Sequence, residues 1–412
     1  MKQKKDILFL CQFFYPEYIS SATLPTDTAI ALSKAGFSVG VLCGYANEYN
    51  LEKEVPLKEI LEGIEIKRLK YKQLKRSSKV GRLINYFSFT LKVAMNFSQF
   101  RRYKSVIVYS NPPILPVIPA LANKIFRTKV IFVSYDVYPE IAHITKSITE
   151  GGMISNVMKW ANKIILKRVE KVVALSNEMK NYLLNCRPIL NEKQIEIIPN
   201  WCEDKFDQNK EDNIQNNILK NIKDEDNLIV SYFGNMGICQ DMDTIIDAIR
   251  QLKEKSKIKF LFAGHGKKMN YIKDIVKEEN LHNVKIFDFL HGQDFEDALN
   301  ISDCFIVSLA EGLTGLCVPS KTYSYMMAGK PILAIMEKDS DIVRDIEQHN
   351  CGYVIQNGGY LNLAKAIEEL YTNSIKRKLM GENSRKIFLE KYTKEKCTKQ
   401  YVDMMKNLLG VE

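Results

Sequence analysis

The stretch SYFGNMGICQDMDT, residues 231–244, decides the fold. An apolar run over residues 228–233 predicts a buried strand, which runs into Gly234 and Gly237, and a helix is expected from residue 244 to 253. Glycine permits positive φ and a close approach of the backbone, and a helix N-terminus offers free N–H groups. A unit of this kind suits a phosphate or diphosphate, although a plain strand-to-helix turn is the alternative. The pattern is neither G-x-G-x-x-G nor a P-loop.

The same alternation of strand and helix extends over the whole chain. We expect strands over residues 7–13, 38–43, 105–109, 129–133, 171–175 and 195–198, and then over 228–233, 257–263, 284–287, 304–308 and 332–335. Predicted helices lie between many of these strands, and Gly36 stops the first, over 23–35. A polar stretch over 207–227 separates the two series, and the tail from 376 to 409 is largely helical. The pattern indicates an α/β fold of two doubly wound, Rossmann-like domains, residues 1–205 and 206–387.

Two further segments resemble the first turn. FLFAGHGKK, residues 260–268, ends a buried strand in Gly-x-Gly followed by Lys267 and Lys268. Lysine is a point-charge partner of phosphate, although these two could simply open a solvated helix. In EGLTGLCVPSK, residues 311–321, Pro319 and Ser320 precede an apolar helix, whose N–H groups would point at a ligand. Ligands of open α/β sheets bind outside the carboxyl ends of the strands, so the three segments are expected to form one site.

Metal binding is not predicted. Asp241 and Asp243 spell D-x-D, but they lie at a helix start, where acids cap N–H groups, and we favour capping. The nine cysteines contain no C-x-x-C and the five histidines are isolated, so no zinc-ligand spacing occurs. The thiols are expected to fill the core in a reducing compartment.

Charge is concentrated in one block. The 412-residue chain has a net charge of +10, and its 66–135 window holds fifteen Lys and Arg and no Asp or Glu. Aromatic residues are interleaved, and residues 82–100 are apolar with basic ends, which favours an anionic membrane surface over 66–104. A solvated basic face is the alternative, and nucleic acid is not expected because no nucleic-acid motif accompanies the block. Four prolines interrupt the apolar run 106–126, which predicts a strand, a turn and a helix in place of a membrane span.

The chain resembles glycosyltransferase family 4, the retaining nucleotide-sugar transferases of GT-B fold. The segments that carry the resemblance include QFFYPEYISSATLPTDTAIALSKAGFSVGVL, YDVYPEIA, ALSNEMK, YFGNMGICQDMDTIIDA, VPSKTYSYMMAGKPILA and NSRKIFLEKYT, and they span most of the chain. Among its members the chain is most similar to bacterial surface-polysaccharide transferases of the N-acetylfucosamine and colanic-acid type. The resemblance implies two domains facing a cleft, with the acceptor on the N-terminal domain and the nucleotide sugar on the C-terminal domain. It also implies that residues 388–412 form a helix crossing back onto the N-terminal domain.

The resemblance assigns roles to donor-side residues. Gly234, Asn235 and Gly237 would line the diphosphate with Gln240 nearby, Lys267 or Lys268 would be catalytic at the leaving phosphate, and Leu290 would flank the base. Thr314, Gly315, Ser320 and Lys321 complete the predicted donor loops.

The chain departs from the Glu-x7-Glu pattern of many members. The two glutamate positions fall on Leu316 and Ser324. We hypothesise that Glu311 or Thr314 substitutes at the sugar.

Acceptor-side candidates follow from topology. Glu17, Ser20 and Ser21 lie in the first strand-to-helix loop, and Asp136 and Glu140 follow a buried strand, where a carboxylate orients a hydroxyl. Helix capping or a surface ion pair is the alternative for each.

The expected function is metal-independent transfer, with retention, of a sugar from a nucleotide diphosphate sugar to a lipid-linked or oligosaccharide acceptor in capsule, O-antigen or exopolysaccharide synthesis. The donor is expected to be UDP-linked and N-acetylated, no cofactor is expected, and the location is cytoplasmic and peripheral on the membrane. A nucleotide-sugar epimerase of the same fold and a non-catalytic membrane scaffold are the alternatives.

Overall fold

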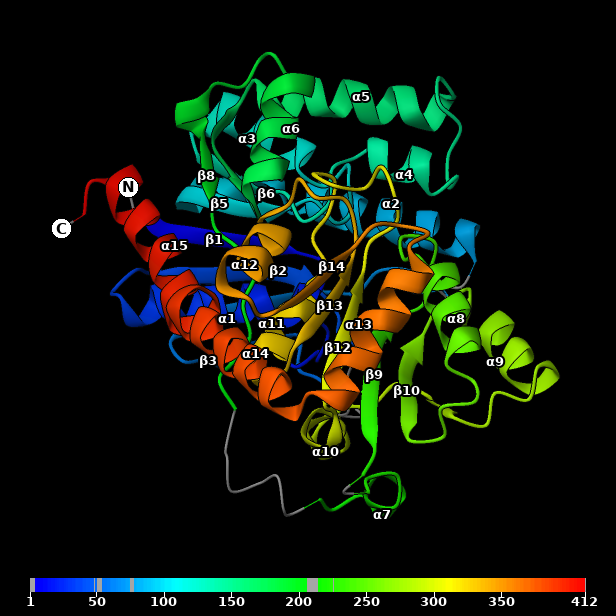
Figure 1. The fold of residues 1–412 in the computed structure, drawn as a ribbon. Coiled ribbons are helices and arrows are strands. Elements are labelled where there is room, and N and C mark those ends of the chain that lie inside the picture. The colour runs from blue at the N-terminus through cyan, green and yellow to red at the C-terminus, as the bar shows by residue number, and fades with distance from the viewer. Residues whose placement is uncertain are drawn as a thin grey trace. The chain divides into compact units, whose positions relative to one another are not determined.

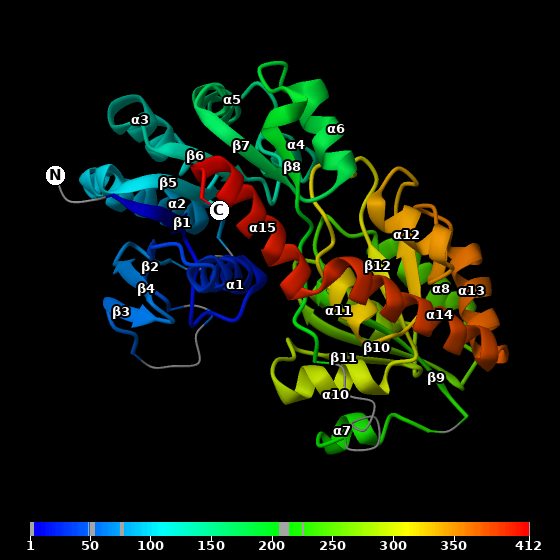
Figure 2. The ribbon, with the colours of Figure 1, turned by 90° about the vertical axis from the view of Figure 1, so that its left-hand side faces the viewer.

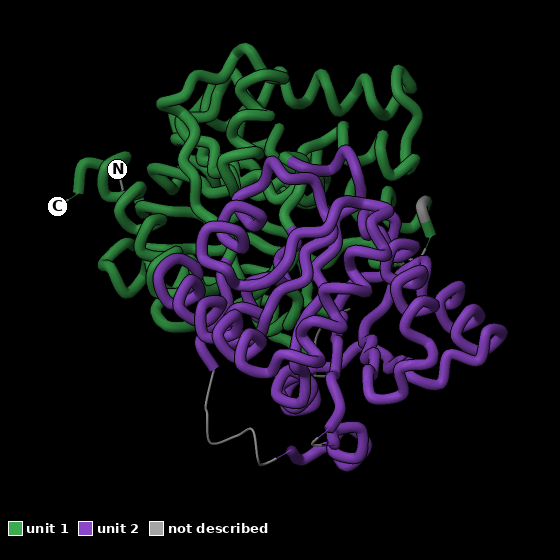
Figure 3. Tube along the Cα trace, in the orientation of Figure 1, with its two compact units in different colours: residues 1–200, 315–318, 394–412 green, residues 201–314, 319–393 purple. Residues whose placement is uncertain are grey.

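The computed structural model describes residues 4–47, 49, 54–74, 78–205, 214–224 and 226–411. The chain forms two compact units (Figure 3). Unit 1 comprises residues 1–200, 315–318 and 394–412, and unit 2 comprises residues 201–314 and 319–393. Part of the predicted polar linker, residues 207–213 and 225, lies outside the described residues.

Unit 1 is built on an eight-stranded sheet of order β3-β4-β2-β1-β5-β6-β7-β8 (Figure 1). The strands are β1 (Lys5–Cys11), β2 (Val39–Gly44), β3 (Lys58–Leu61), β4 (Ile64–Leu69), β5 (Tyr103–Tyr109), β6 (Lys129–Val133), β7 (Val169–Ala174) and β8 (Ile195–Ile197). All pairs are parallel except β3 with β4. This hairpin is absent from the sequence prediction because the side chains of β3 alternate between exposed and half-buried, so no apolar run marks the strand.

Helices cover both faces of this sheet. They are α1 (Ser20–Lys34), α2 (Lys79–Met95), α3 (Val117–Phe126), α4 (Glu140–Ile144), α5 (Met153–Leu166), α6 (Asn177–Cys186) and α15 (Lys394–Leu409), with 3-10 turns η1 (Phe97–Arg102) and η2 (Glu192–Gln194). Gly36 follows α1 with φ 92°, as its predicted stop position requires. The C-terminal α15 packs on α1 (Figure 2), and Lys129 Nζ donates to Leu408 O at 2.7 Å. The predicted return of the last helix is therefore confirmed within unit 1.

The apolar run 106–126 folds as the sequence predicts, as β5, a turn and α3. Among the described residues, no helix has the length and apolar character needed to cross a bilayer.

Unit 2 contains a six-stranded sheet of order β11-β10-β9-β12-β13-β14 in which every pair is parallel. The strands are β9 (Leu228–Asn235), β10 (Ile258–His265), β11 (Val284–Phe287), β12 (Cys304–Ser308), β13 (Ile332–Ile335) and β14 (Gly352–Ile355). After β9 the chain adds β10 and β11 on one side of β9. It then crosses to the other side of β9, where it adds β12, β13 and β14. The strand order therefore reverses beside β9, and ligands of open α/β sheets bind at such a switch point.

The helices of unit 2 are α7 (Asn217–Lys220), α8 (Met242–Gln251), α9 (Met269–Glu278), α10 (Gln293–Ile301), α11 (Lys321–Met327), α12 (Asp341–His349), α13 (Tyr360–Thr372) and α14 (Ser374–Ile387), followed by the π-turn η4 (Phe388–Tyr392). Tyr325 fixes α11 to the sheet. Its buried ring stacks on Phe305 at 4.2 Å, and its hydroxyl accepts from the N–H of Phe233 and donates to the Phe233 carbonyl, both at 2.8 Å. The start of α11 is thereby held beside the end of β9.

Candidate functional site

The backbones at the carboxyl ends of β9 and β10 approach each other so closely that only glycine fits there. A Cβ at Gly264 would lie 1.9 Å from the Gly234 carbonyl oxygen, and one at Gly266 would lie 2.3 Å from the Met236 oxygen. These three glycines have φ of 145°, 151° and 141°. Met236 N donates to His265 O at 2.7 Å, and Lys268 N donates to Met236 O at 2.9 Å. The result is a bare backbone surface at the carboxyl edge of the sheet, which a phosphate group can approach closely.

Asn235 and Gln240 complete this turn. A Cβ on Gly237 would lie 2.8 Å from Asn235 Nδ2, and one on Gly266 would lie 2.7 Å from Asn235 Oδ1, so both glycines leave room for the Asn235 carboxamide. Gln240 Oε1 accepts from the N–H of Gly237 at 3.0 Å. The amide group of Gln240 is therefore oriented by the loop, with its Nε2 hydrogens left to serve as donors.

Asp241 is a helix cap, as the sequence predicts. Its Oδ1 accepts from Thr244 N at 3.1 Å, and its Oδ2 accepts from Thr244 Oγ1 at 2.7 Å and from Asn357 Nδ2 at 3.0 Å. Burial raises the pKa of Asp241, but the hydrogen bonds from Thr244 and Asn357 outweigh it and lower the pKa overall. Asp243 pairs with Lys268 at 3.0 Å. No cluster of three or more potential metal-ligating side chains occurs among the described residues.

Lys321 lies behind Gly234 at the start of α11. Its Cγ is 3.5 Å from where a Cβ of Gly234 would be. Its ammonium group lies 5.1 Å from the ring centroid of Phe295 and 5.9 Å from that of Phe289, within cation–π range. Burial lowers the pKa of Lys321, and a negative charge on Cys202 would oppose this shift. A cation in this setting has lost much of its water and gains strongly from an anionic partner.

The neighbouring cations are arranged differently. His265 ends β10, its ring lies 5.5 Å from that of Phe289, and burial together with the charge of Lys321 lowers its pKa. Lys268 is half-buried and engaged with Asp243, whereas Lys267 is exposed. Leu290, expected beside the base, is partly buried next to Phe289.

The two Glu-x7-Glu positions hold no acid. Leu316 is buried, and Ser324 is buried with its hydroxyl donating to Lys321 O at 2.8 Å. Glu311 is exposed. Thr314 Oγ1 is buried without a hydrogen-bond partner among the described residues, so this hydroxyl is the better placed of the two predicted substitutes to bind a ligand.

Of the other predicted donor residues, Gly315 has a local structural role, whereas Ser320 makes no capping contact. Gly315 belongs to unit 1, where its φ of 82° and its closeness to α6 both require glycine, because a Cβ would lie 3.0 Å from Glu178 O. Ser320 precedes α11 in helical conformation, and its side chain makes no capping hydrogen bond.

Asp136 is an acceptor candidate whose carboxyl pKa is raised by burial. It follows β6, and the N–H groups of Tyr135 and Asp136 donate to Ser110 Oγ at 3.0 and 3.3 Å, which ties it to the end of β5. Burial raises the pKa of Asp136 to about 6. Its carboxyl borders a cavity of about 20 Å³ that Ser110 and Arg187 also line, a volume sufficient for one water molecule.

The other acceptor candidates fall into two groups. Glu140 forms an ion pair with Arg187, whose Nη2 lies 2.7 Å from both carboxylate oxygens, so the alternative of an ion pair holds for this residue. Glu17 is buried within the first strand-to-helix loop. Ser20 and Ser21 open α1, with Ser20 exposed.

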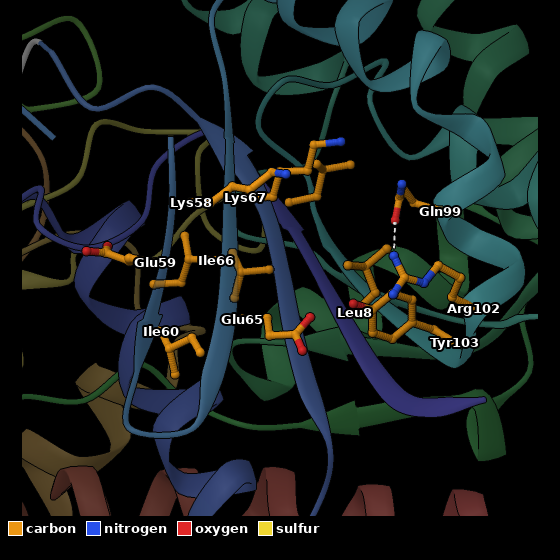
Figure 4. A pocket seen from close by; sticks show the side chains of 12 residues that line it. Leu8, Lys58, Glu59, Ile60, Glu65, Ile66, Lys67, Gln99, Arg102 and Tyr103 are labelled. Carbon is orange, nitrogen blue, oxygen red and sulfur yellow. Dashed lines mark hydrogen bonds between the residues drawn. The ribbon is translucent and has the colours of Figure 1, made fainter. Parts of the chain in front are cut away.

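A larger cavity, of about 400 Å³, lies elsewhere in unit 1 (Figure 4). It is lined by residues that include Lys67, Gln99 and Tyr103, and Arg102 donates to Gln99 Oε1 at 3.1 Å. Because Tyr103 is the first residue of β5, this cavity lies toward the amino ends of the strands, away from the edge that carries Asp136.

The sequence analysis misses the surroundings of Lys321. Phe289 follows β11, Phe295 lies on α10, and neither belongs to a recognisable motif. Arg187, the partner of Glu140, is missed for the same reason. The signal that could have found the two phenylalanines is topological, since both follow a strand whose carboxyl end meets those of β9 and β10.

Comparison with known proteins shows which proteins this chain is similar to. Residues 213–387 match the family model described as glycosyl transferases group 1. The matched segment covers most of unit 2, and the chain has the GT-B fold of its structural neighbours.

Two curated relatives and one solved structure illustrate what the chain is similar to. The chain is 27% identical to the probable glycosyltransferase WbjE of Pseudomonas aeruginosa over 322 residues, which cover 76% of this chain and 78% of WbjE. It is 24% identical to the putative colanic acid biosynthesis glycosyl transferase WcaI of Escherichia coli K12, covering 62% and 63% of the two chains. The crystal structure of HepE from Anabaena with UDP-glucose superposes with a TM-score of 0.70 at 16% identity, covering 98% of this chain and all of HepE.

Proposed function

We propose that the chain transfers an N-acetylated sugar from UDP to a lipid-linked acceptor in the synthesis of a capsule, O-antigen or exopolysaccharide. The observation that carries the donor side is Lys321, held among aromatic rings behind Gly234 at the switch point of the unit 2 sheet. The UDP-glucose complex of the HepE structure supports a uridine nucleotide, and the WcaI relationship supports a surface polysaccharide.

In this proposal the diphosphate lies against Gly234, Asn235 and Gly237. The amide of Gln240 and the ammonium group of Lys321 donate to its oxygens, and Lys267 and Lys268 add positive charge from the β10 side. Leu290 and Phe289 contact the base. Many family members have a glutamate where this chain has Ser324, and a carboxylate there would pair with Lys321 at i,i+3. Serine at this position leaves the Lys321 ammonium available to the ligand.

The reaction breaks the bond between the anomeric carbon and the diphosphate oxygen and forms one between that carbon and the acceptor oxygen on the same face. The acceptor proton passes to the departing phosphate oxygen, so no enzymic nucleophile is needed. Negative charge develops on the diphosphate, and a preorganised lysine stabilises it where water is excluded. The capping role of Asp241 and the pairing of Asp243 with Lys268 support a reaction without a metal.

Unit 1 is proposed to hold the acceptor. Asp136, ionised above its raised pKa, accepts a hydrogen bond from the acceptor hydroxyl and orients it. Ser20 and Ser21 lie at the entrance with the buried Glu17 beneath them, and Glu140 supports the loop through Arg187. On the donor sugar, Thr314 or Glu311 takes the place of the absent glutamates, with the unpartnered Thr314 hydroxyl favoured. The acceptor lipid implies a protein peripheral on the cytoplasmic membrane face, contacted through residues 66–104; Lys75 and Arg76 of this block lie outside the described residues.

A thermal-shift screen of UDP, GDP, ADP and their sugars, followed by product mass spectrometry with a lipid-linked acceptor, tests the proposal. UDP is expected to raise the melting temperature, and sugar transfer is expected to require the acceptor. Wild-type activity in both Thr314→Ala and Glu311→Gln would overturn the sugar contact. An epimer or glycal formed from donor alone would favour an epimerase, and the absence of any nucleotide-induced shift would favour a scaffold.

A further inference from the structure

Helix α2 of unit 1 exposes a stripe of apolar side chains. Val80, Phe87, Leu91 and Met95 all point away from the protein, with Phe87 57% and Leu91 63% exposed. Their spacing of seven, four and four residues places them on one side of an α-helix. The opposite side of α2 packs inward through Phe89 and Val93, which are fully buried. The helix is thus apolar on both sides, and within the described part of the chain these outer side chains remain exposed.

Helix α5 has the same character and lies outside the basic block of the sequence. Met153, Val157 and Trp160 follow an i, i+4, i+7 spacing and are exposed, Trp160 by 60% and Met153 by 81%. Lys159, Lys163 and Lys167 lie at i+4 steps along the adjacent side and are also exposed. Buried positions such as Ala161 and Ile165 form the inner side.

Helix α3 joins the two stripes. It contacts both α2 and α5, and its Leu121 and Ile125 are exposed four residues apart. The exposed apolar residues of α2, α3 and α5 therefore belong to neighbouring helices, and together they are called the α2–α3–α5 face. Exposed apolar side chains gathered on neighbouring helices are typical of an interaction site.

The charges around this face have one sign. The sequence has no Asp or Glu from residue 66 to 135 and none from 151 to 169. The exposed basic residues on or beside the three helices are Lys92, Arg101, Lys124, Arg127, Lys159, Lys163 and Lys167. Two copies of the chain placed face to face would bring these cations together, so a second copy is a poor occupant. An anionic bilayer accepts both the apolar stripes and the cations, at about 1 kcal/mol per Lys or Arg near the surface.

We infer that the α2–α3–α5 face docks on an anionic lipid bilayer, with Phe87 and Leu91 entering the acyl boundary and Trp160 lying at the headgroup level. The face extends beyond residues 66–104, since α5 supplies its tryptophan and a row of lysines. Helix α2 follows β4 and α3 follows β5, so both helices start at the carboxyl edge of the unit 1 sheet. Asp136, which follows β6, lies at the same edge. Only the purpose of docking, access to a lipid-linked acceptor, rests on the proposed function.

Flotation of the full chain with vesicles of phosphatidylglycerol and phosphatidylcholine, against phosphatidylcholine alone, tests the inference. The chain is expected to float with the anionic vesicles and to be released as salt is raised. Phe87→Ser with Trp160→Ala is expected to lower the bound fraction at least about fivefold, and Lys159→Glu with Lys163→Glu to do likewise. Ile375→Ser removes an apolar side chain of unit 2 that is 81% exposed, more than Phe87 or Trp160, and is the control.

Fluorescence gives a second readout, because the chain has two tryptophans and Trp201 is buried. Anionic vesicles are expected to shift the emission to the blue in the wild type and not in Trp160→Phe. The inference would be overturned if both double variants bound the anionic vesicles as the wild type does, or if the wild-type emission did not shift to the blue. It would also be overturned if light scattering showed a dimer of the wild type that is lost in the Phe87→Ser/Trp160→Ala variant. UDP-induced thermal stabilisation should be unchanged in these variants, which separates failure of docking from failure of the proposed function.

Discussion

Replacing Lys321 by methionine removes the ammonium group behind Gly234 while keeping the length of the side chain. The loss of one preorganised donor to a developing negative charge costs about 10²–10³ in kcat, or about 3–4 kcal/mol. The substitution should not lower the folding stability. Burial lowers the pKa of Lys321, so the unfolded chain binds its proton more readily than the folded one. Folding stability then rises with pH between the lowered pKa and the ordinary value near 10.4, and Lys321→Met should lose this slope and melt at the wild-type temperature or above it.

Steady-state kinetics with donor and acceptor, with melting temperatures measured in parallel, test this reasoning. Lys321→Arg should retain part of the activity. The alkaline fall in rate, caused by deprotonation of Lys321 as pH rises through its lowered pKa, should move upward because arginine stays charged. Lys268→Met is the matched control and should lose less, because Lys268 is already engaged with Asp243. A Lys321→Met enzyme with wild-type kcat and donor KM would refute the assignment, and so would a loss explained by unfolding.

Three further outcomes are expected. Asp241→Ala should lower the free energy of unfolding by about 1 kcal/mol in urea titrations through loss of the helix cap, while EDTA leaves wild-type activity unchanged; strong EDTA inhibition would contradict the capping assignment. Gly264→Ala should abolish the UDP-induced thermal shift, because its Cβ would meet Gly234 O at 1.9 Å, whereas Gly410→Ala, which follows α15 in unit 1 and has no atom within 4 Å of its Cβ, should keep the shift. Wild-type activity should fall as pH drops through about 6, where Asp136 takes up a proton, and Asp136→Asn should be slow and lack this limb; an unchanged profile would remove Asp136 from the acceptor site.

Much of the fold could be predicted from sequence, because buried parallel strands leave continuous apolar runs. The predicted bounds of β6, β11, β12 and β13 agree with those observed, and Gly36 ends α1 as expected. The capping role of Asp241 is also confirmed, since an acid at a helix start has a local hydrogen-bonding reason to be there.

Long-range contacts could not be predicted in this way. The rings that surround Lys321 come from α10 and from the loop after β11, and only the folded sheet brings them together. The pairing of Glu140 with Arg187 joins residues 47 positions apart. The β3–β4 hairpin is exposed on one side and leaves too weak an apolar pattern. Local motifs thus located the turns of the site, whereas the environment of each side chain required the tertiary structure.

The place of α15 in unit 1 has a consequence for how the protein is made. Cys397, Tyr401 and Met405 are buried, and α15 packs on α1, almost the whole chain length away. Residues 1–200 leave the ribosome long before residue 394 is synthesised. Unit 1 therefore lacks its last helix during the whole time in which unit 2 is translated. The first unit to be translated is therefore the last to be completed. An N-terminal fragment would expose the apolar surface that α15 covers, and such surface invites aggregation.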